Sequence, residues 1–173
     1  MKKRIQCVEK KNKKRNPVFA LQLSLMNAKE FCEKLCEIHL KIEQTSNHFE
    51  IERNEWRDSR IFQKALWVAL IIEIGRLFDN FRETENKKVI SFKKVFKDSP
   101  LKSKIDNIHG SAVISKMIRT RDTFMAHISE EQEDIISVAE ICNSNLGKLL
   151  DELDAPLSAF VAYFVDSRGW EKL

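Results

Sequence analysis

The sequence predicts an all-α protein, an up-and-down four-helix bundle with additional short helices. Apolar residues recur at helical spacings of three and four along most of the 173-residue chain. Only four glycines and three prolines occur, which disfavours a sheet-rich fold with many tight turns. The connections between the long periodic segments are short, as they are between antiparallel helices of a bundle.

The first long helix is expected at 18–48, opened by Pro17. Its apolar stripe consists of Val18, Leu21, Leu25, Ala28, Cys32, Leu35 and Ile42. A stripe of this kind packs against neighbouring helices. His39 lies on the same stripe, where a histidine is more often a hydrogen-bonded core residue than a ligand.

The second long helix, expected at 58–82, is apolar on two sides and is therefore predicted to be the central, buried helix. One side holds Phe62, Leu66, Ala69, Leu70 and Leu77, and the other holds Trp67, Ile71, Ile74, Phe78 and Phe81. Glu73 falls on the first side. Its carboxylate needs a partner, because burying a lone charge costs several kcal/mol.

Two short helices are expected next. Ser91 is suited to cap a helix over 92–96. Ser99 is suited to cap a second one with Pro100 at its first position, and Gly110 interrupts it.

The third and fourth long helices are expected at 111–128 and 134–153, separated by an acidic loop at 129–134. The third carries the stripe Ile114, Ile118, Arg121, Met125 and Ile128, and the fourth carries Ile135, Val138, Cys142, Leu146, Leu149 and Leu153. Pro156 is expected to restart the chain into a final apolar helix that ends at Gly169.

The charge of the chain is unevenly distributed. Residues 1–15 hold eight basic residues and one acidic residue, a charge of +7; since the whole chain carries +4, the remainder carries −3. We expect a basic, disordered arm at 1–16 and a single helical domain at 17–173. The basic residues expected to bind RNA are Lys10, Lys11, Lys13, Lys14 and Arg15. A leader that only keeps the protein soluble is the open alternative.

Several function classes are disfavoured. The basic start is not followed by the apolar segment of a signal peptide, and the longest apolar run, 65–72, is too short to span a bilayer, so we expect a cytoplasmic protein without a membrane partner. The four cysteines (Cys7, Cys32, Cys36 and Cys142) repeat no zinc-binding spacing, so free thiols and no metal are expected. Glycine-rich phosphate loops are absent, and no cofactor is expected.

The segment Arg121–His127 has the clearest chemical content. Arg121 lies on an apolar stripe between Ile118 and Met125, where a guanidinium is costly unless an anion meets it. His127 lies about 9 Å further along the axis and about 120° around an unbroken helix. Both side chains can therefore face one cleft only if the helix bends or ends near His127.

Arginine and histidine together can cleave RNA without a metal. The ribose 2′-hydroxyl is the nucleophile, the histidine transfers protons, and the arginine offsets charge on the phosphate. The arginine and histidine of one chain include a single proton-transfer group. This favours a two-fold dimer in which the arginine–histidine pairs of two chains lie together. Asp122 could orient either residue, while Glu73 and Asp79 could hold Arg121 from the neighbouring helix. Alternatively, Arg121 is a structural arginine paired with Glu73 or Asp79, and His127 is a helix-end residue favoured by the helix dipole.

The arginine, the polar Asp122, four more residues and then His127 resemble the signature of the HEPN superfamily (higher eukaryotes and prokaryotes nucleotide-binding domain). The run from Leu66 to Asp79 resembles the family's second helix. Within it, 73–79 is similar to a branch linked to phage abortive infection. The resemblance covers about residues 20–155.

This resemblance implies a four-helix bundle that forms a homodimer, with Arg121 and His127 lining a cleft at the interface. It implies a metal-independent endoribonuclease of toxin–antitoxin or antiviral defence systems, with an antitoxin or a nucleotidyltransferase as partner. Members paired with nucleotidyltransferases usually carry a tyrosine where this chain has Ser129. This difference argues against a chain that such a nucleotidyltransferase modifies at that position. The alternative is a non-catalytic member that binds a nucleotide, RNA or a partner protein.

Overall fold

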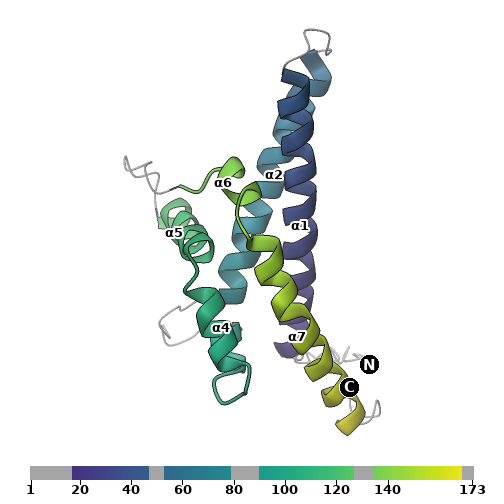
Figure 1. The fold of residues 1–173 in the computed structure, drawn as a ribbon, viewed down its shortest axis with the longest axis vertical. Coiled ribbons are helices and arrows are strands. Elements are labelled where there is room, and N and C mark those ends of the chain that lie inside the picture. Colours follow the sequence, from purple (N-terminus) through teal and green to yellow (C-terminus); the bar gives the residue numbers. More distant parts are fainter. Residues whose placement is uncertain (1–16, 47–52, 79–89, 127–134, 169–173) are drawn as a thin grey trace, which may run out of the picture.

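The computed structural model of the chain describes residues 17–46, 53–78, 90–126 and 135–168. Within these ranges the chain forms seven helices and no β-strand, so the predicted all-α class is confirmed. The two longest helices, α1 (Pro17–Ser46) and α2 (Arg53–Phe78), lie antiparallel along the long axis of the molecule (Figure 1). The helix α5 (Ala112–Ala126) packs on α2, while α7 (Leu146–Arg168) runs obliquely along α1.

The predicted stripe of the first long helix forms the core side of α1. Every apolar residue predicted on it is buried, including Leu25, Ala28 and Leu35, which have no exposed surface. His39 is half-buried, with its Nδ1 3.4 Å from Nε2 of Gln63 and its Nε2 3.3 Å from Oε1 of Glu43. This arrangement agrees with the interpretation of His39 as a hydrogen-bonded core histidine.

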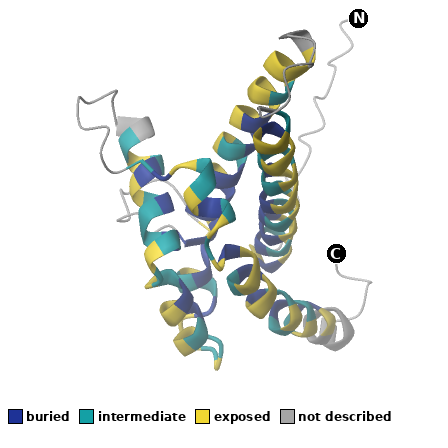
Figure 2. Ribbon diagram, turned by 45° about the horizontal axis from the view of Figure 1, so that its top comes forward, coloured by how far each residue is buried: buried dark blue, intermediate teal, exposed yellow. Residues whose placement is uncertain are grey.

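The prediction that α2 is buried on both apolar sides is wrong for part of the helix. Leu66, Leu70 and Leu77 are buried as expected, but Phe62 is 55% exposed. Ile61 and Ile72 are also exposed. In the described part of the chain, α1, α5 and α3 pack on α2, and they leave these three side chains exposed. Figure 2 shows the same division, with buried positions on the inner sides of the helices.

The prediction of one helix over 134–153 is also wrong. The short helix α6 (Val138–Cys142) is capped by Asn143, and α7 begins at Leu146. Ser144 stabilises the break, because its Oγ donates to the Ile141 carbonyl (2.6 Å) and accepts from the Leu146 N–H (3.2 Å). Asparagine and serine favour such local bonding over helix continuation.

The prediction that Pro156 restarts the chain into a final helix is wrong, because Pro156 lies inside α7. A proline in a helix interior deprives the carbonyl four residues earlier of its donor. That carbonyl belongs to Glu152, an exposed residue, so water can replace the missing donor. The helix therefore continues past Pro156.

The two short helices between α2 and α5 are present; the first begins where it was predicted, and the second begins later. The helix α3 (Phe92–Val95) follows Ser91, whose side chain makes no capping bond. The helix α4 (Lys102–His109) begins two residues after Pro100, because Ser99 accepts the Leu101 N–H (3.2 Å) in a turn ahead of the helix. As predicted, Gly110 separates this helix from α5.

An aromatic cluster joins these short helices to the long ones. The rings of Phe78 and Phe92 lie 5.6 Å apart, those of Phe92 and Phe96 lie 6.0 Å apart, and Phe160 of α7 meets Phe96 edge-on at 5.2 Å. His109 at the end of α4 packs on Phe78, with ring centroids 6.1 Å apart. The cluster thus ties α2, α3, α4 and α7 into one core.

The stability of this cluster should depend on pH through His109. Burial, with a smaller effect of Lys93, lowers the pKa of the His109 imidazole below its ordinary value of 6.5. The unfolded chain therefore binds this proton more readily, so the stability contribution is complete above pH 6.5 and is lost as the pH falls through the native pKa. Urea unfolding at pH 7.5 and 5.5 should show a smaller loss of stability at pH 5.5 for His109→Gln than for the wild type. An equal loss would contradict the prediction.

Candidate functional site

Arg121 lies on α5 on the side that faces α2. Its side chain is only 13% exposed, and its Nε and Nη2 both donate to Oδ1 of Asp122, at 2.9 and 2.6 Å. Asp122 is itself exposed, so the ion pair lies at the protein surface. The requirement that an anion meet this guanidinium is therefore fulfilled by its sequence neighbour.

The Arg121 side chain rests on a glycine of α2. A Cβ atom at Gly75 would lie 2.3 Å from Cδ, 2.7 Å from Nη1 and 3.0 Å from Nε of Arg121. Any residue other than glycine would occupy the space that the guanidinium now fills. We refer to Gly75 with the adjoining surface of α2 as the arginine seat.

Sequence reasoning did not identify the role of Gly75. A glycine within a helix costs about 1 kcal/mol relative to alanine, so an isolated one within a helical pattern points to close packing. Gly75 is the one glycine within the helix predicted at 58–82, and this was the available signal. The partner it accommodates could not be read from the same pattern, because Arg121 belongs to another helix.

Glu73 does not hold Arg121, contrary to one of the roles considered for it. Two positions along an α-helix are rotated by about 200°, so Glu73 and Gly75 face nearly opposite directions. The Glu73 carboxylate is buried and accepts from Nη1 of Arg76 at 3.1 and 3.4 Å. The expectation that Glu73 needs a partner is confirmed, and the partner is Arg76.

The other predicted site residues lie outside the described residues. They are His127, Asp79 and the basic residues Lys10, Lys11, Lys13, Lys14 and Arg15. The helix α5 is described as far as Ala126, the residue before His127.

Arg121 is positioned by a buried hydrogen-bond network at the neighbouring residue, Thr120. Thr120 is fully buried, and its Oγ1 accepts the Ile136 N–H (2.9 Å) and donates to the Lys116 carbonyl (2.9 Å). The Ile136 carbonyl in turn accepts from Nε1 of Trp67 on α2 (3.0 Å). These bonds hold the second half of α5 against α2 and against the segment that leads into α6.

An ion pair ties α5 to α6 as well. Nζ of Lys116 lies 2.5 Å from Oε1 of Glu140, and this bond, with bonds from Ser137, lowers the pKa of the Glu140 carboxyl to about 2. Ser137 and Glu140 also form a reciprocal capping box at the start of α6. The helix that carries Arg121 is thus braced by α2 and by α6.

Replacing Thr120 with valine should test this brace. Valine keeps the shape but leaves the buried Ile136 N–H without its Thr120 acceptor, which should cost about 1–3 kcal/mol of unfolding free energy. Thr123→Val is the matched control, because the Thr123 hydroxyl donates to the Arg119 carbonyl of its own helix (3.0 Å). Urea denaturation should give a lower unfolding free energy for Thr120→Val than for Thr123→Val. Equal stabilities would show that the network does not brace α5.

None of the helices in the described ranges has the length and apolarity needed to cross a bilayer. Comparisons of this chain with models of protein families, with curated proteins and with solved structures find no match.

Proposed function

We propose that this chain is a metal-independent endoribonuclease of the HEPN type, acting in the cytoplasm as a toxin or phage-defence effector. The observation that carries the proposal is the seated Arg121. Its guanidinium is oriented by Asp122 and by the glycine of the seat, on the same helix that leads to His127. A cation held in one orientation at the surface suits the recognition of a phosphate.

The proposed role of Arg121 is to bind the scissile phosphate. Its Nε and Nη2 form the edge of the guanidinium that can donate two parallel bonds to an anion. This edge donates to Oδ1 of Asp122, whose carboxylate is exposed. An entering phosphate would replace one anionic partner with another, so the guanidinium would need little rearrangement.

The proposed role of His127 is proton transfer. A histidine titrates near neutral pH, so it can remove the proton of the 2′-hydroxyl or protonate the leaving 5′-oxygen. The expected products carry 2′,3′-cyclic phosphate and 5′-hydroxyl ends. The basic residues of the arm would add affinity for RNA without taking part in the cleavage.

The experiment that tests this function is digestion of labelled RNA by the purified protein in EDTA, with DNA of the same sequence as the control. Cleavage of RNA alone, with cyclic phosphate ends, is expected. Products with 3′-hydroxyl ends, or activity that needs a divalent ion, would contradict the proposed mechanism.

We also propose a homodimer, because each chain supplies one Arg-His set, and an antitoxin as a further partner. The apolar stripe of α5 does not offer a dimer surface, because Ile114 is fully buried and Ile118 packs against the core. An exposed apolar residue, Ile72, lies one turn from Gly75. A two-fold contact around Ile72 would bring the two arginine seats close together.

Ile72→Glu should therefore convert the dimer to a monomer and abolish RNA cleavage, since a buried unpaired carboxylate opposes association. Ile61→Glu is the matched control, because Ile61 is equally apolar and exposed but lies about 21 Å along α2 from Gly75. Sedimentation at micromolar concentrations measures the oligomeric state of both variants. A wild-type monomer, or a dimer unaffected by Ile72→Glu, would contradict this contact.

The second candidate function is a non-catalytic module that binds a nucleotide, RNA or a partner protein. It is favoured by the ion pair itself, because Asp122 already neutralises Arg121 and could have a structural role. RNA binding without any cleavage would support this candidate.

A further inference from the structure

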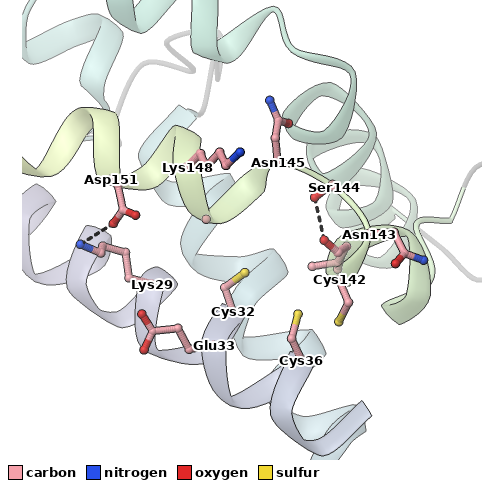
Figure 3. Close-up of a pocket in the computed structure, with 12 residues that line it drawn as sticks. Lys29, Cys32, Glu33, Cys36, Cys142, Asn143, Ser144, Asn145, Lys148 and Asp151 are labelled. Carbon is pink, nitrogen blue, oxygen red and sulfur yellow. Dashed lines mark hydrogen bonds and ion pairs between the residues drawn. The ribbon is translucent and has the colours of Figure 1, made fainter. Parts of the chain in front are cut away.

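Three of the four cysteines come together at a site remote from Arg121. Cys32 and Cys36 lie one turn apart on α1, and Cys142 is the last residue of α6. All three line a cavity of about 490 Å³ between α1, α6 and the start of α7. Figure 3 shows their sulfur atoms in a row, with Cys36 between the other two.

Polar residues line the rest of the cavity. Nζ of Lys29 bridges from α1 to Asp151 (2.8 Å) and Asp154 (2.7 Å) of α7. The Asn143–Asn145 break between α6 and α7 forms another part of the wall. Cys36 and Cys142 are half-buried, so small solutes can reach them, whereas Cys32 is buried.

The three thiols differ in their chemistry. Hydrogen bonds from Cys32 and Cys142 lower the pKa of the Cys36 thiol to about 6. The bond to Cys36, with burial, raises the pKa of Cys32, while burial and then Cys36 raise that of Cys142 to about 12. At neutral pH, Cys36 therefore carries the thiolate, which is the reactive form of cysteine.

Geometry selects the partner with which Cys36 can form a disulfide. Residues four apart on a helix have Cβ atoms about 5–6 Å apart, whereas a disulfide needs about 3.5–4.5 Å. A bond between Cys32 and Cys36 would therefore require α1 to unwind. Cys142 belongs to a five-residue helix that ends in a turn, so it can approach Cys36 with a small shift.

We propose that this thiol cluster is an oxidation site for hydroperoxides, at which Cys36 reacts first and Cys142 then closes an intramolecular disulfide. The Cys36 thiolate attacks one peroxide oxygen, the O–O bond breaks, and hydroxide or alkoxide leaves with the electron pair. The Cys36 sulfenic acid formed in this way is attacked by the sulfur of Cys142. The S–S bond forms, water leaves, and the peroxide has accepted both electrons.

The cross-link would join α1 to α6 across more than 100 residues of chain. On its other side, α6 is already tied to α5 by the pair of Lys116 and Glu140. Oxidation would therefore connect α1, α6 and α5, and closing so long a loop should raise the melting temperature by several degrees.

The test uses full-length protein with Cys7→Ser, so that three thiols remain, treated with hydrogen peroxide near stoichiometry. We expect the loss of two thiols, a mass decrease of two hydrogen atoms in a monomeric chain, and a cross-linked Cys36–Cys142 peptide. Reduction with dithiothreitol should restore all three thiols. Retention of three thiols, a Cys32–Cys36 peptide, or cross-linking between chains would each overturn the proposal.

Two further variants separate the roles of the thiols. With Cys142→Ser, Cys36 sulfenic acid should accumulate and be trapped by dimedone. With Cys32→Ala, the Cys36–Cys142 disulfide should still form. The pH midpoint for alkylation of Cys36 should lie near 6 with Cys32 present and rise with Cys32→Ala, because the side-chain donor to the thiolate is lost. Dimedone labelling of Cys32 in place of Cys36, or an unchanged midpoint, would overturn the assignment.

Discussion

His127→Ala should lower the rate of RNA cleavage by about 10²–10⁴, because it removes the proposed proton-transfer group. The assay is digestion of labelled RNA in EDTA, with wild type and variant purified in parallel. Thermal unfolding should show that the variant remains folded. His48→Ala is the matched control, since that histidine lies outside the Arg-His motif, and it should retain full activity.

Two outcomes would contradict this prediction in different ways. Equal activity of the wild type and His127→Ala would identify a contaminating ribonuclease. No activity from either protein, together with binding of RNA, would favour the non-catalytic module.

Arg121→Ala should lower the cleavage rate by about 10²–10³, by analogy with the loss of a donor that stabilises charge in a transition state. Arg121→Lys should restore only part of the activity, since an ammonium group lacks the planar Nε–Nη2 edge that can donate two parallel bonds to a phosphate. The fold should persist, because alanine is a good helix former at this position of α5. Full rescue by lysine would show that only charge matters.

Gly75→Ala tests the role of Arg121 without removing the arginine side chain. The added Cβ would lie 2.3 Å from Cδ of Arg121, so the guanidinium must leave its seat. Activity should fall, while stability should change little, because alanine favours the helix by about 1 kcal/mol and the displaced group is the end of a flexible side chain. The double variant with Arg121→Ala should be no less active than Arg121→Ala alone.

Gly147→Ala is the matched control for the seat. Gly147 also lies in a helix, α7, but a Cβ there would meet no atom within 4 Å. This variant should keep full activity. If Gly75→Ala were equally active, the seat would have no part in function.

The sequence alone determined the helical class and much of the core. The stripe of α1 was predicted residue by residue, because helical periodicity is a local property and Pro17 marks the start. The need for an anion at Arg121 and for a partner at Glu73 could also be predicted, since the cost of burying a charge depends little on the fold.

Tertiary structure decided which groups meet. Whether Phe62 is buried depends on which helices pack on α2, and the choice of Asp122 over Glu73 as partner of Arg121 depends on how α2 is rotated against α5. The break before α7 depends on the local bonds of Ser144. The meeting of Cys142 with Cys36, more than 100 residues apart, has no periodic signature, because only packing of α6 on α1 brings them together.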